Sequence, residues 1–275
     1  MQLITSPQNQ LVKYLNRLKE KRHRSQEHKF LAEGTRFVEE ALNVPGLVEM
    51  LVYSPELLSA GRSEPLLELA RQAGASITAV SARVFRALAD TQTPQGVLAV
   101  VRMPVLKLDD LILLLGLASQ RGNPLLVVVD GVQDPGNLGT IVRSAAAFGA
   151  SGLVLCRGTV DLFNPKVLRA TMGAVFKLPV WQDVDINTLG HLLQQMGLEI
   201  LLSSPQGDVS LTAAGLTGRV ALVIGSEARG VSNQWRQFTR RAFRIPMQED
   251  VESLNAGIAA AVILYEAYRQ RTCRP

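Results

Sequence analysis

The sequence predicts an α/β protein with two domains, a smaller N-terminal α/β domain and a C-terminal domain built on a parallel sheet. The chain has 275 residues, 47% of them hydrophobic and 19% charged, which is enough to bury a sizeable core. Short apolar runs alternate with helical stretches along most of the chain. A segment that contains Pro104 and ends in a turn at residues 120–124 separates two such series. We therefore expect domains at residues 1–104 and 124–275, joined by a linker at residues 105–123.

The N-terminal segment is the most positively charged part of the chain. Between residues 13 and 29, seven residues are basic and two are acidic. Apolar residues recur there at helical spacing, at positions 11, 14, 15 and 18, after a possible helix start at Ser6-Pro7. We therefore expect one amphipathic helix with a basic outer face. That face suits either a solvated surface or contact with a phosphate backbone.

The rest of the N-terminal domain alternates helices and strands up to about residue 103. The periodicity predicts helices at 35–42, 64–73 and 83–89 and strands at 47–53, 76–80 and 97–101. Residues 102–123 include a Leu-rich helical stretch within the connecting segment.

The C-terminal domain opens with a continuous apolar run at 125–129, which is typical of a strand buried on both faces. Further strands are predicted at 152–155, 178–181, 199–203, 220–224 and 242–245. Helices are predicted at 138–148, 165–174, 186–196 and 254–268. This alternation indicates a parallel sheet covered by helices on both sides.

Composition excludes several classes of protein. The two cysteines, Cys156 and Cys273, lie far apart and form no ligand cluster, which argues against a disulfide scaffold or a structural metal site. We expect a cytoplasmic protein without a metal. The first ten residues lack the pattern of a targeting segment, and the longest apolar stretch is far shorter than the roughly 20 residues that cross a membrane. The net charge of +5 is compatible with a polyanionic partner.

The first of three chemically unusual segments follows the strand at 125–129. It reads D-G-V-Q-D-P-G-N-L-G-T from Asp130 to Thr140. A strand that turns directly into a helix is where α/β folds place ligands, because free N–H groups and the positive end of the helix dipole point outward there. The glycine spacing does not fit G-x-G-x-x-G. Asn137 is also a candidate helix cap, and Arg143 alone is compatible with an ordinary surface arginine.

The second segment, I-G-S-E-A-R-G-V-S at 224–232, also follows an apolar strand. Val231 and Ser232 stand where a P-loop needs lysine and serine or threonine, which argues against an ordinary nucleoside triphosphate site. Glycines let a ligand approach the backbone closely, and Glu227 is a candidate acceptor or orienting group. The alternative is a plain turn with a solvated glutamate.

The third segment has I-P-M at 245–247 and S-L-N at 253–255, before a helix rich in alanine. Ser253 is expected to cap that helix. Capping by Ser253 does not require Asn255, whose amide suits the recognition of a purine edge or another polar substrate group.

In this order and spacing, the three segments resemble motifs 1, 2 and 3 of the SpoU family of RNA 2′-O-ribose methyltransferases, within the SPOUT class. The resemblance covers residues 125–271 and includes D-L-F-N-P-K-V-L-R-A-T-M-G-A at 161–174. Residues 30–42 and 93–97 look like the family's auxiliary RNA-binding domain of ribosomal-protein type.

The resemblance implies a deep trefoil knot formed by the segments that hold residues 225–230 and 245–255. It also implies bound S-adenosylmethionine and an obligate homodimer whose active site is completed across the interface. The implied cofactor-binding residues are Ser203, Ser204, Gly225, Gly230, Ile245, Met247 and Leu254. The implied residues for catalysis and RNA engagement are Asn137, Arg143, Glu227, Ser253 and Asn255. In the N-terminal domain the candidate RNA-binding residues are Lys13, Arg17, Lys21, Arg22, Arg24 and Arg36.

The implied reaction is an in-line attack of a ribose 2′-oxygen on a sulfonium methyl group. In the family, the arginine at the position of Arg143 is given the role of accepting the proton of the ribose hydroxyl. A guanidinium pKa above about 12 makes the neutral form that could accept this proton rare. We expect Arg143 to bind the adjacent phosphate and lower the pKa of the hydroxyl, with Glu227 and Asn137 orienting the arginine and the ribose. Ser226 and Ala228 replace the Asn and Gly more usual in motif 2, so we expect altered loop detail and retained activity.

Large-subunit ribosomal RNA is the expected substrate, because a second domain and a basic segment accompany the methylase motifs; transfer RNA is the alternative. From a different class, a catalytically inactive ribosome assembly factor is the main rival, and the intact set of five catalytic candidates weighs against it. A nucleotide-dependent oxidoreductase lacks its glycine fingerprint and ribose-binding acidic residue here. A methylase dedicated to antibiotic resistance would share every motif discussed.

Overall fold

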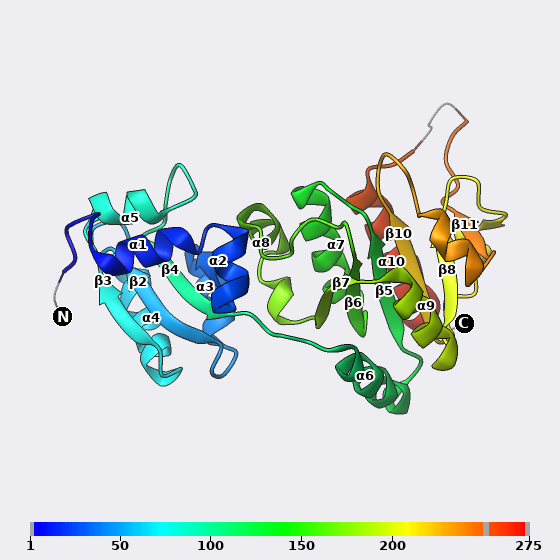
Figure 1. Ribbon diagram of the computed structural model, residues 1–275, viewed down its shortest axis with the longest axis horizontal. Helices are drawn as coiled ribbons and strands as arrows, with labels where there is room; N and C mark the ends of the chain where they lie inside the picture. Colours follow the sequence, from blue (N-terminus) through cyan, green and yellow to red (C-terminus); the bar gives the residue numbers. More distant parts are fainter. Residues whose placement is uncertain (1–2, 250–252, 273–275) are drawn as a thin grey trace. The chain divides into compact units, whose positions relative to one another are not determined.

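The computed structural model describes residues 3–249 and 253–272, which form two α/β units (Figure 1). One unit comprises Met1–Val105 with Phe163–Phe176, and the other comprises Leu106–Leu162 with Lys177–Pro275. The predicted α/β class, with a parallel sheet in the C-terminal part of the chain, is confirmed. The linker and domain boundaries expected at 105–123 stay predictions.

The first unit is built on a mixed four-stranded sheet of order β1-β4-β2-β3. Its β1 pairs antiparallel with β4, β4 antiparallel with β2, and β2 parallel with β3. The elements are α1 (Gln10–Arg17), α2 (Lys21–Glu27), β1 (Lys29–Glu33), α3 (Thr35–Leu42), β2 (Val48–Tyr53), α4 (Ala60–Gln72), β3 (Ser76–Ala79), α5 (Ala82–Leu88), β4 (Val97–Arg102), α8 (Pro165–Thr171) and η1 (Ala174–Phe176).

The basic N-terminal segment forms two helices and a strand, so the single helix predicted there is wrong. The first helix starts after Asn9, whose side chain accepts a hydrogen bond from the Leu11 N–H at 2.9 Å. It ends at Arg17, and the chain turns before α2. Alternate burial then marks β1, in which Phe30 and Ala32 point into the core.

Arg24 lies buried at the turn between α1 and α2, contrary to the prediction that it contacts RNA. Its side chain is only 5% exposed, and its guanidinium donates hydrogen bonds to the carbonyls of Leu18 at 3.4 Å and Lys19 at 2.5 Å. These carbonyls lie just past the end of α1, where a helix leaves acceptors without intrahelical partners. Arg24 therefore stabilises the turn between the two helices and is not presented to RNA.

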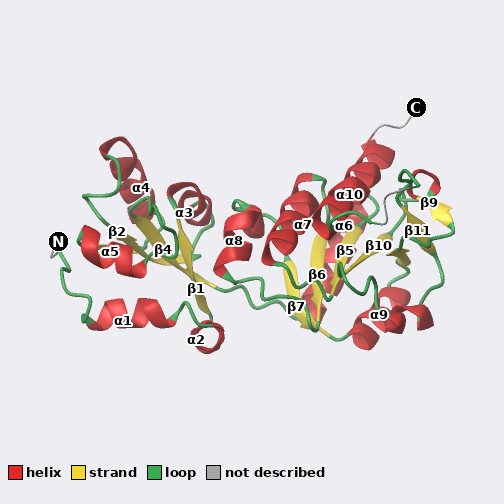
Figure 2. Cartoon of the chain, turned by 90° about the horizontal axis from the view of Figure 1, so that it is seen from above, coloured by secondary structure: helices red, strands yellow, loops and turns green. Residues whose placement is uncertain are grey.

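The second unit is built on a seven-stranded sheet of order β7-β6-β5-β10-β8-β11-β9, in which all neighbours are parallel. Figure 2 shows α7 and α10 on one face and α9 on the other. The elements are α6 (Leu108–Arg121), β5 (Leu125–Asp130), α7 (Pro135–Ala147), β6 (Gly152–Cys156), β7 (Val180–Val184), α9 (Ile186–Gln195), β8 (Glu199–Ser203), β9 (Val209–Ser210), η2 (Leu211–Ala213), β10 (Val220–Gly225), η3 (Asn233–Gln237), β11 (Ala242–Arg244) and α10 (Ala256–Thr272).

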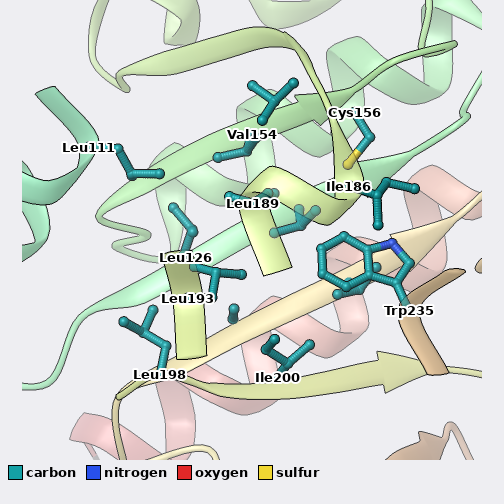
Figure 3. Packing of buried hydrophobic residues seen from close by; sticks show 14 of the residues in the cluster. Leu111, Leu126, Val154, Cys156, Ile186, Leu189, Leu193, Leu198, Ile200 and Trp235 are labelled. Atoms are coloured by element: carbon teal, nitrogen blue, oxygen red, sulfur yellow. The ribbon is translucent and has the colours of Figure 1, made fainter. Parts of the chain in front are cut away.

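The core of this unit lies between the sheet and its helices (Figure 3). Leu111 of α6, Leu189 of α9 and Leu126 of β5 pack in one cluster, so the Leu-rich stretch expected in the linker contributes to this core. Burial raises the pKa of the Cys156 thiol, which lies in the same cluster; Cys273 lies outside the described residues. Within the described ranges, no helix has both the length and the hydropathy needed to cross a membrane.

We predict that Arg24→Ala lowers the free energy of unfolding by about 1–3 kcal/mol, because two main-chain carbonyls lose a charged donor. Arg22→Ala, which removes an exposed arginine from the same helix, is the matched control and is expected to change stability by less than about 0.5 kcal/mol. Chemical denaturation followed by circular dichroism measures both. Equal stability of the two variants would contradict the capping role of Arg24.

Candidate functional site

Three loops meet where neighbouring parallel strands end. Because β10, β8 and β11 are adjacent in the sheet, their carboxyl ends lie side by side. The loops that follow them line one cavity of about 280 Å³, at the edge where α/β sheets bind ligands. The cavity is lined by Ser203, Ser204, Pro205, Gln206, Ile224, Gly225, Ser226, Glu227, Arg229, Gly230, Phe243, Ile245, Met247, Ser253, Leu254, Ala256, Ala259 and Ile263.

The structure brings together every residue predicted to hold the cofactor. All seven lie in the lining of this cavity, although they come from three separate stretches of sequence. Glu227 and Ser253, from the catalytic set, lie in the same lining. The clustering supports the cofactor-binding roles, which stay predictions.

The loop from residue 225 to 230 is closed by its own backbone. The Ser226 N–H donates to the Gly230 carbonyl at 3.1 Å, and the Gly230 N–H donates back at 2.9 Å. The Ser226 hydroxyl also accepts from the Arg229 N–H at 3.2 Å, so this departure from the usual motif helps to close the loop. A Cβ on Gly225 would lie 2.1 Å from the Gly230 carbonyl carbon, and therefore only glycine fits there.

Asn137 and Glu227 form a hydrogen-bonded pair beside this loop. The Asn137 side-chain amide donates to the Glu227 carboxylate, and Asn137 is only 8% exposed. Asn137 does not cap α7, contrary to one prediction. The cap is Asp134, which accepts from the Asn137 N–H at 2.8 Å and precedes Pro135 at the first helical position. Because Asp134 fills that role, the Asn137 side chain is available to hold Glu227.

The cap of α10 also differs from the prediction. The helix begins at Ala256, so Ser253 lies too far upstream to cap it. The Asn255 side-chain oxygen instead accepts from the Gly257 N–H at 3.0 Å and the Ile258 N–H at 3.2 Å. Asparagine is as good a cap as serine. A structural role therefore accounts for Asn255, and its engagement of RNA stays a prediction.

Arg143 lies apart from the cavity within a single chain. It is exposed on α7, and its guanidinium forms no hydrogen bond or ion pair with the residues that the structure describes. It follows Thr140 by three residues, so the two side chains leave α7 on similar faces. Thr140 lies against the start of α10, where a Cβ on Gly257 would be 3.1 Å from the Thr140 Cβ.

Sequence reasoning missed part of the cavity wall, including Gln206, Arg229 and Phe243. The close approach of the loop after β8 to β11 was also missed: a Cβ on Gly207 would lie 2.3 Å from the Phe243 carbonyl carbon. The available signal was the run S-S-P-Q-G directly after a buried strand, which combines a turn with a glycine.

Two families match the chain. Residues 124–265 match the SpoU rRNA Methylase family, and residues 9–99 match the MRM3-like substrate binding domain. The chain is 32% identical over 265 residues to the 23S rRNA (guanosine(2553)-2′-O)-methyltransferase RlmP of Bacillus subtilis, covering 96% of this chain and 98% of that protein. It is 42% identical over 151 residues to the 23S rRNA (guanosine-2′-O-)-methyltransferase RlmB of Xylella fastidiosa, covering 55% of this chain and 61% of that protein.

Solved structures with bound cofactor match nearly the whole chain. The SpoU methyltransferase AviRb from Streptomyces viridochromogenes in complex with AdoMet superposes with a TM-score of 0.85 at 29% identity, covering 96% of this chain and 98% of that one. An AdoMet-bound rRNA methyltransferase from Sinorhizobium meliloti gives a TM-score of 0.85 at 29% identity, covering 98% of this chain and 97% of that one.

We predict that Gly225→Ala weakens binding of S-adenosylhomocysteine, the demethylated cofactor, by at least about tenfold, because the added Cβ displaces the loop that lines the cavity. Gly116→Ala is the control, since a Cβ there meets nothing within 4 Å. Isothermal titration calorimetry measures affinity, and circular dichroism checks that both variants are folded. Unchanged affinity in a folded Gly225→Ala variant would show that the loop does not form the binding site.

Proposed function

The chain belongs to the SpoU rRNA methylase family, and we propose that it transfers the methyl group of S-adenosylmethionine to a ribose 2′-hydroxyl of large-subunit ribosomal RNA. The observation that carries this proposal is the Asn137–Glu227 pair, which joins two motif segments at the wall of the cavity. The names of the relatives, which are 23S ribosomal RNA 2′-O-methyltransferases, support the substrate and the reaction.

The cavity residues fit the cofactor. Ile245, Leu254 and Ile263 provide an apolar wall suited to a purine, whereas Ser203, Ser204 and Gln206 provide hydroxyl and amide groups for polar edges. The volume of about 280 Å³ is close to the lower end of the range typical of small-molecule sites, roughly 300–1,000 Å³. When bound, S-adenosylmethionine supplies the electrophilic methyl group.

The side chains of this chain position the acceptor and assist loss of its proton. Asn137 holds the Glu227 carboxylate at the cavity wall, where one oxygen accepts from Asn137 and the other can accept from a ribose hydroxyl. Arg143 binds the adjacent phosphate, and its positive charge lowers the pKa of the hydroxyl. Ser253 lies at the same wall and contributes a further polar group to the acceptor.

The first unit binds the RNA outside the target nucleotide. Its match to a substrate-binding domain supports this role. Five of the six basic residues predicted for it are exposed, and each phosphate they neutralise adds salt-dependent affinity. These five are Lys13, Arg17, Lys21, Arg22 and Arg36.

A trefoil knot in the second unit is part of the proposal. In support, β10 lies between β5 and β8 in the sheet although it follows both in sequence. The loop after β10 and the segment after β11 line the same cavity, as expected if one segment passes through the loop made by another. Knots are rare exceptions to ordinary chain connectivity, so the family resemblance also supports this assignment.

The active protein is proposed to be a cytoplasmic homodimer. Ile258, Val262 and Tyr265 are 54%, 39% and 54% exposed and recur along one face of α10 at a spacing of four and three residues. Contiguous exposed apolar groups of this kind mark protein interfaces. A second copy on this face brings its own Arg143 to the site, which agrees with the position of Arg143 outside the cavity in one chain.

Methyl transfer to RNA tests the proposed activity. With labelled S-adenosylmethionine and total RNA from cells that lack this gene, we expect label at one alkali-resistant site in large-subunit ribosomal RNA. Asn137→Ala and Arg143→Ala are expected to abolish it, because each removes a group that positions the acceptor. Label on transfer RNA would show that transfer RNA is the substrate in place of ribosomal RNA. Absence of both label and cofactor binding would favour an inactive RNA-binding protein.

Disruption of the apolar face tests the dimer. We predict that Val262→Glu halves the mass measured by light scattering and abolishes methyl transfer, since a charge enters an apolar interface. Mixing Arg143→Ala with Glu227→Gln subunits is expected to restore part of the activity, because a mixed dimer contains one site with both native residues. A monomeric and fully active Val262→Glu variant would contradict the shared site.

A further inference from the structure

A second cavity lies on the other side of the 225–230 loop. It has a volume of about 720 Å³, and its walls come from the loops after β5, β6 and β10. Glu227 and Arg229 line this cavity as well as the first one, so the loop forms a partition between the two. The volume lies within the range of small-ligand sites.

Arg157 places a positive charge in this second cavity. It directly follows β6, and its N–H donates to the Val184 carbonyl at 3.0 Å, which fixes its backbone. Its side chain is 65% exposed and its only described ion pair is a 3.6 Å contact with Asp185. The Asp185 carboxylate is also engaged as the cap of α9. A surface ion pair of this kind is weak, and the guanidinium keeps donors for an incoming anion.

Neutral hydrogen-bonding groups surround the same space. The Ser232 hydroxyl is buried and has no hydrogen-bond partner among the described residues, although the Ser232 N–H donates to Asp130 at 2.7 Å. The Gln133 amide nitrogen donates to the Gly158 carbonyl, which leaves the Gln133 side-chain oxygen as an acceptor. Because the Ser232 hydroxyl is itself closed to water, the groups that this wall offers to a ligand are the Gln133 oxygen and the Arg157 guanidinium.

We propose that this second cavity holds a nucleotide of the RNA substrate, with Arg157 binding a phosphate and Gln133 binding a polar edge of the base or ribose. The inference rests on the proposed methyl transfer, because Glu227 connects this cavity to the cofactor side of the loop. A guanidinium beside an amide oxygen matches the phosphate of one nucleotide and a hydrogen-bond donor on its base or ribose.

The test compares Arg157→Gln with Arg240→Gln in the full chain. Arg240 is exposed, lies in the same unit and lines neither cavity, so both variants lose one charge. For Arg157→Gln, we expect the KM for an in vitro transcript of large-subunit ribosomal RNA to rise about tenfold, with unchanged affinity for S-adenosylhomocysteine. The slope of log affinity against log salt is expected to fall by about 1, as for the loss of one phosphate contact.

Further variants define the chemistry of the contact. Arg157→Lys is expected to recover the salt slope and part of the affinity, because lysine keeps the charge but not the planar fork. Gln133→Ala is expected to weaken RNA binding without any change in salt slope, since it removes a neutral group. If adenosine monophosphate binding is lost in Arg157→Gln while RNA affinity is unchanged, the cavity binds a free nucleotide and the proposal is overturned.

The failure of this inference is distinguishable from the failure of the proposed function. If the unmodified protein methylates RNA and Arg157→Gln matches Arg240→Gln in KM and salt slope, the nucleotide site is wrong and the methyltransferase activity stands. If the unmodified protein methylates no RNA but Arg157→Gln still reduces RNA affinity and salt slope, the cavity is an RNA site and the proposed activity is wrong.

Discussion

The hydrogen bond between the Asn137 amide and the Glu227 carboxylate is the interaction on which the site depends. It joins the loop after β5 to the loop after β10, and these two strands are parallel neighbours whose ends are in register, Asp130 beside Gly225. Asn137 is free to make this bond because Asp134 caps the helix. The carboxylate is thereby held at the wall of both cavities without a cation, which leaves the nearby arginines available for phosphate.

A steric constraint on the backbone acts beside the hydrogen bond between Asn137 and Glu227. Gly225 and Gly207 each occupy a place where a Cβ would collide with backbone at 2.1 and 2.3 Å. Gly225 ends β10 and meets the far end of its own loop, whereas Gly207 follows β8 and meets the backbone of β11, so each glycine lets two main-chain segments approach more closely than side chains would permit. Four residues of the tight 225–230 loop, Ser226, Glu227, Arg229 and Gly230, line both cavities. In the proposed reaction the acceptor oxygen reaches the methyl group directly, so Glu227, which lines both cavities, marks the place where a nucleotide held in the second cavity meets the cofactor.

Much of the fold could be predicted from the sequence, because buried strands and helices have recognisable patterns of apolar residues. The residues of β5 are buried on both faces, so the strand reads as an unbroken apolar run. The motif segments were also found, because their glycines and amides have no role in an ordinary core.

The two helix caps were assigned wrongly, since Asp134 and Asn137, or Ser253 and Asn255, are all good caps. Pro135 at the first helical position was the unused signal in favour of Asp134. The burial of Arg24 depends on how α2 folds back on α1, which no local pattern encodes.

The position of Arg143 outside the cavity indicates how the site is completed. Within one chain the cavity is lined by the cofactor-binding loops and by Glu227, but Arg143 lies on α7 outside that cavity. The same side of the sheet carries α10, whose exposed Ile258, Val262 and Tyr265 would be costly to leave in water. In the proposed dimer, a second copy that covers this face removes the apolar surface from solvent and supplies the missing cation in one step. In the proposed dimer, association and completion of the site are therefore the same event, and a dissociated subunit retains the cofactor cavity while it lacks the group that engages the RNA phosphate.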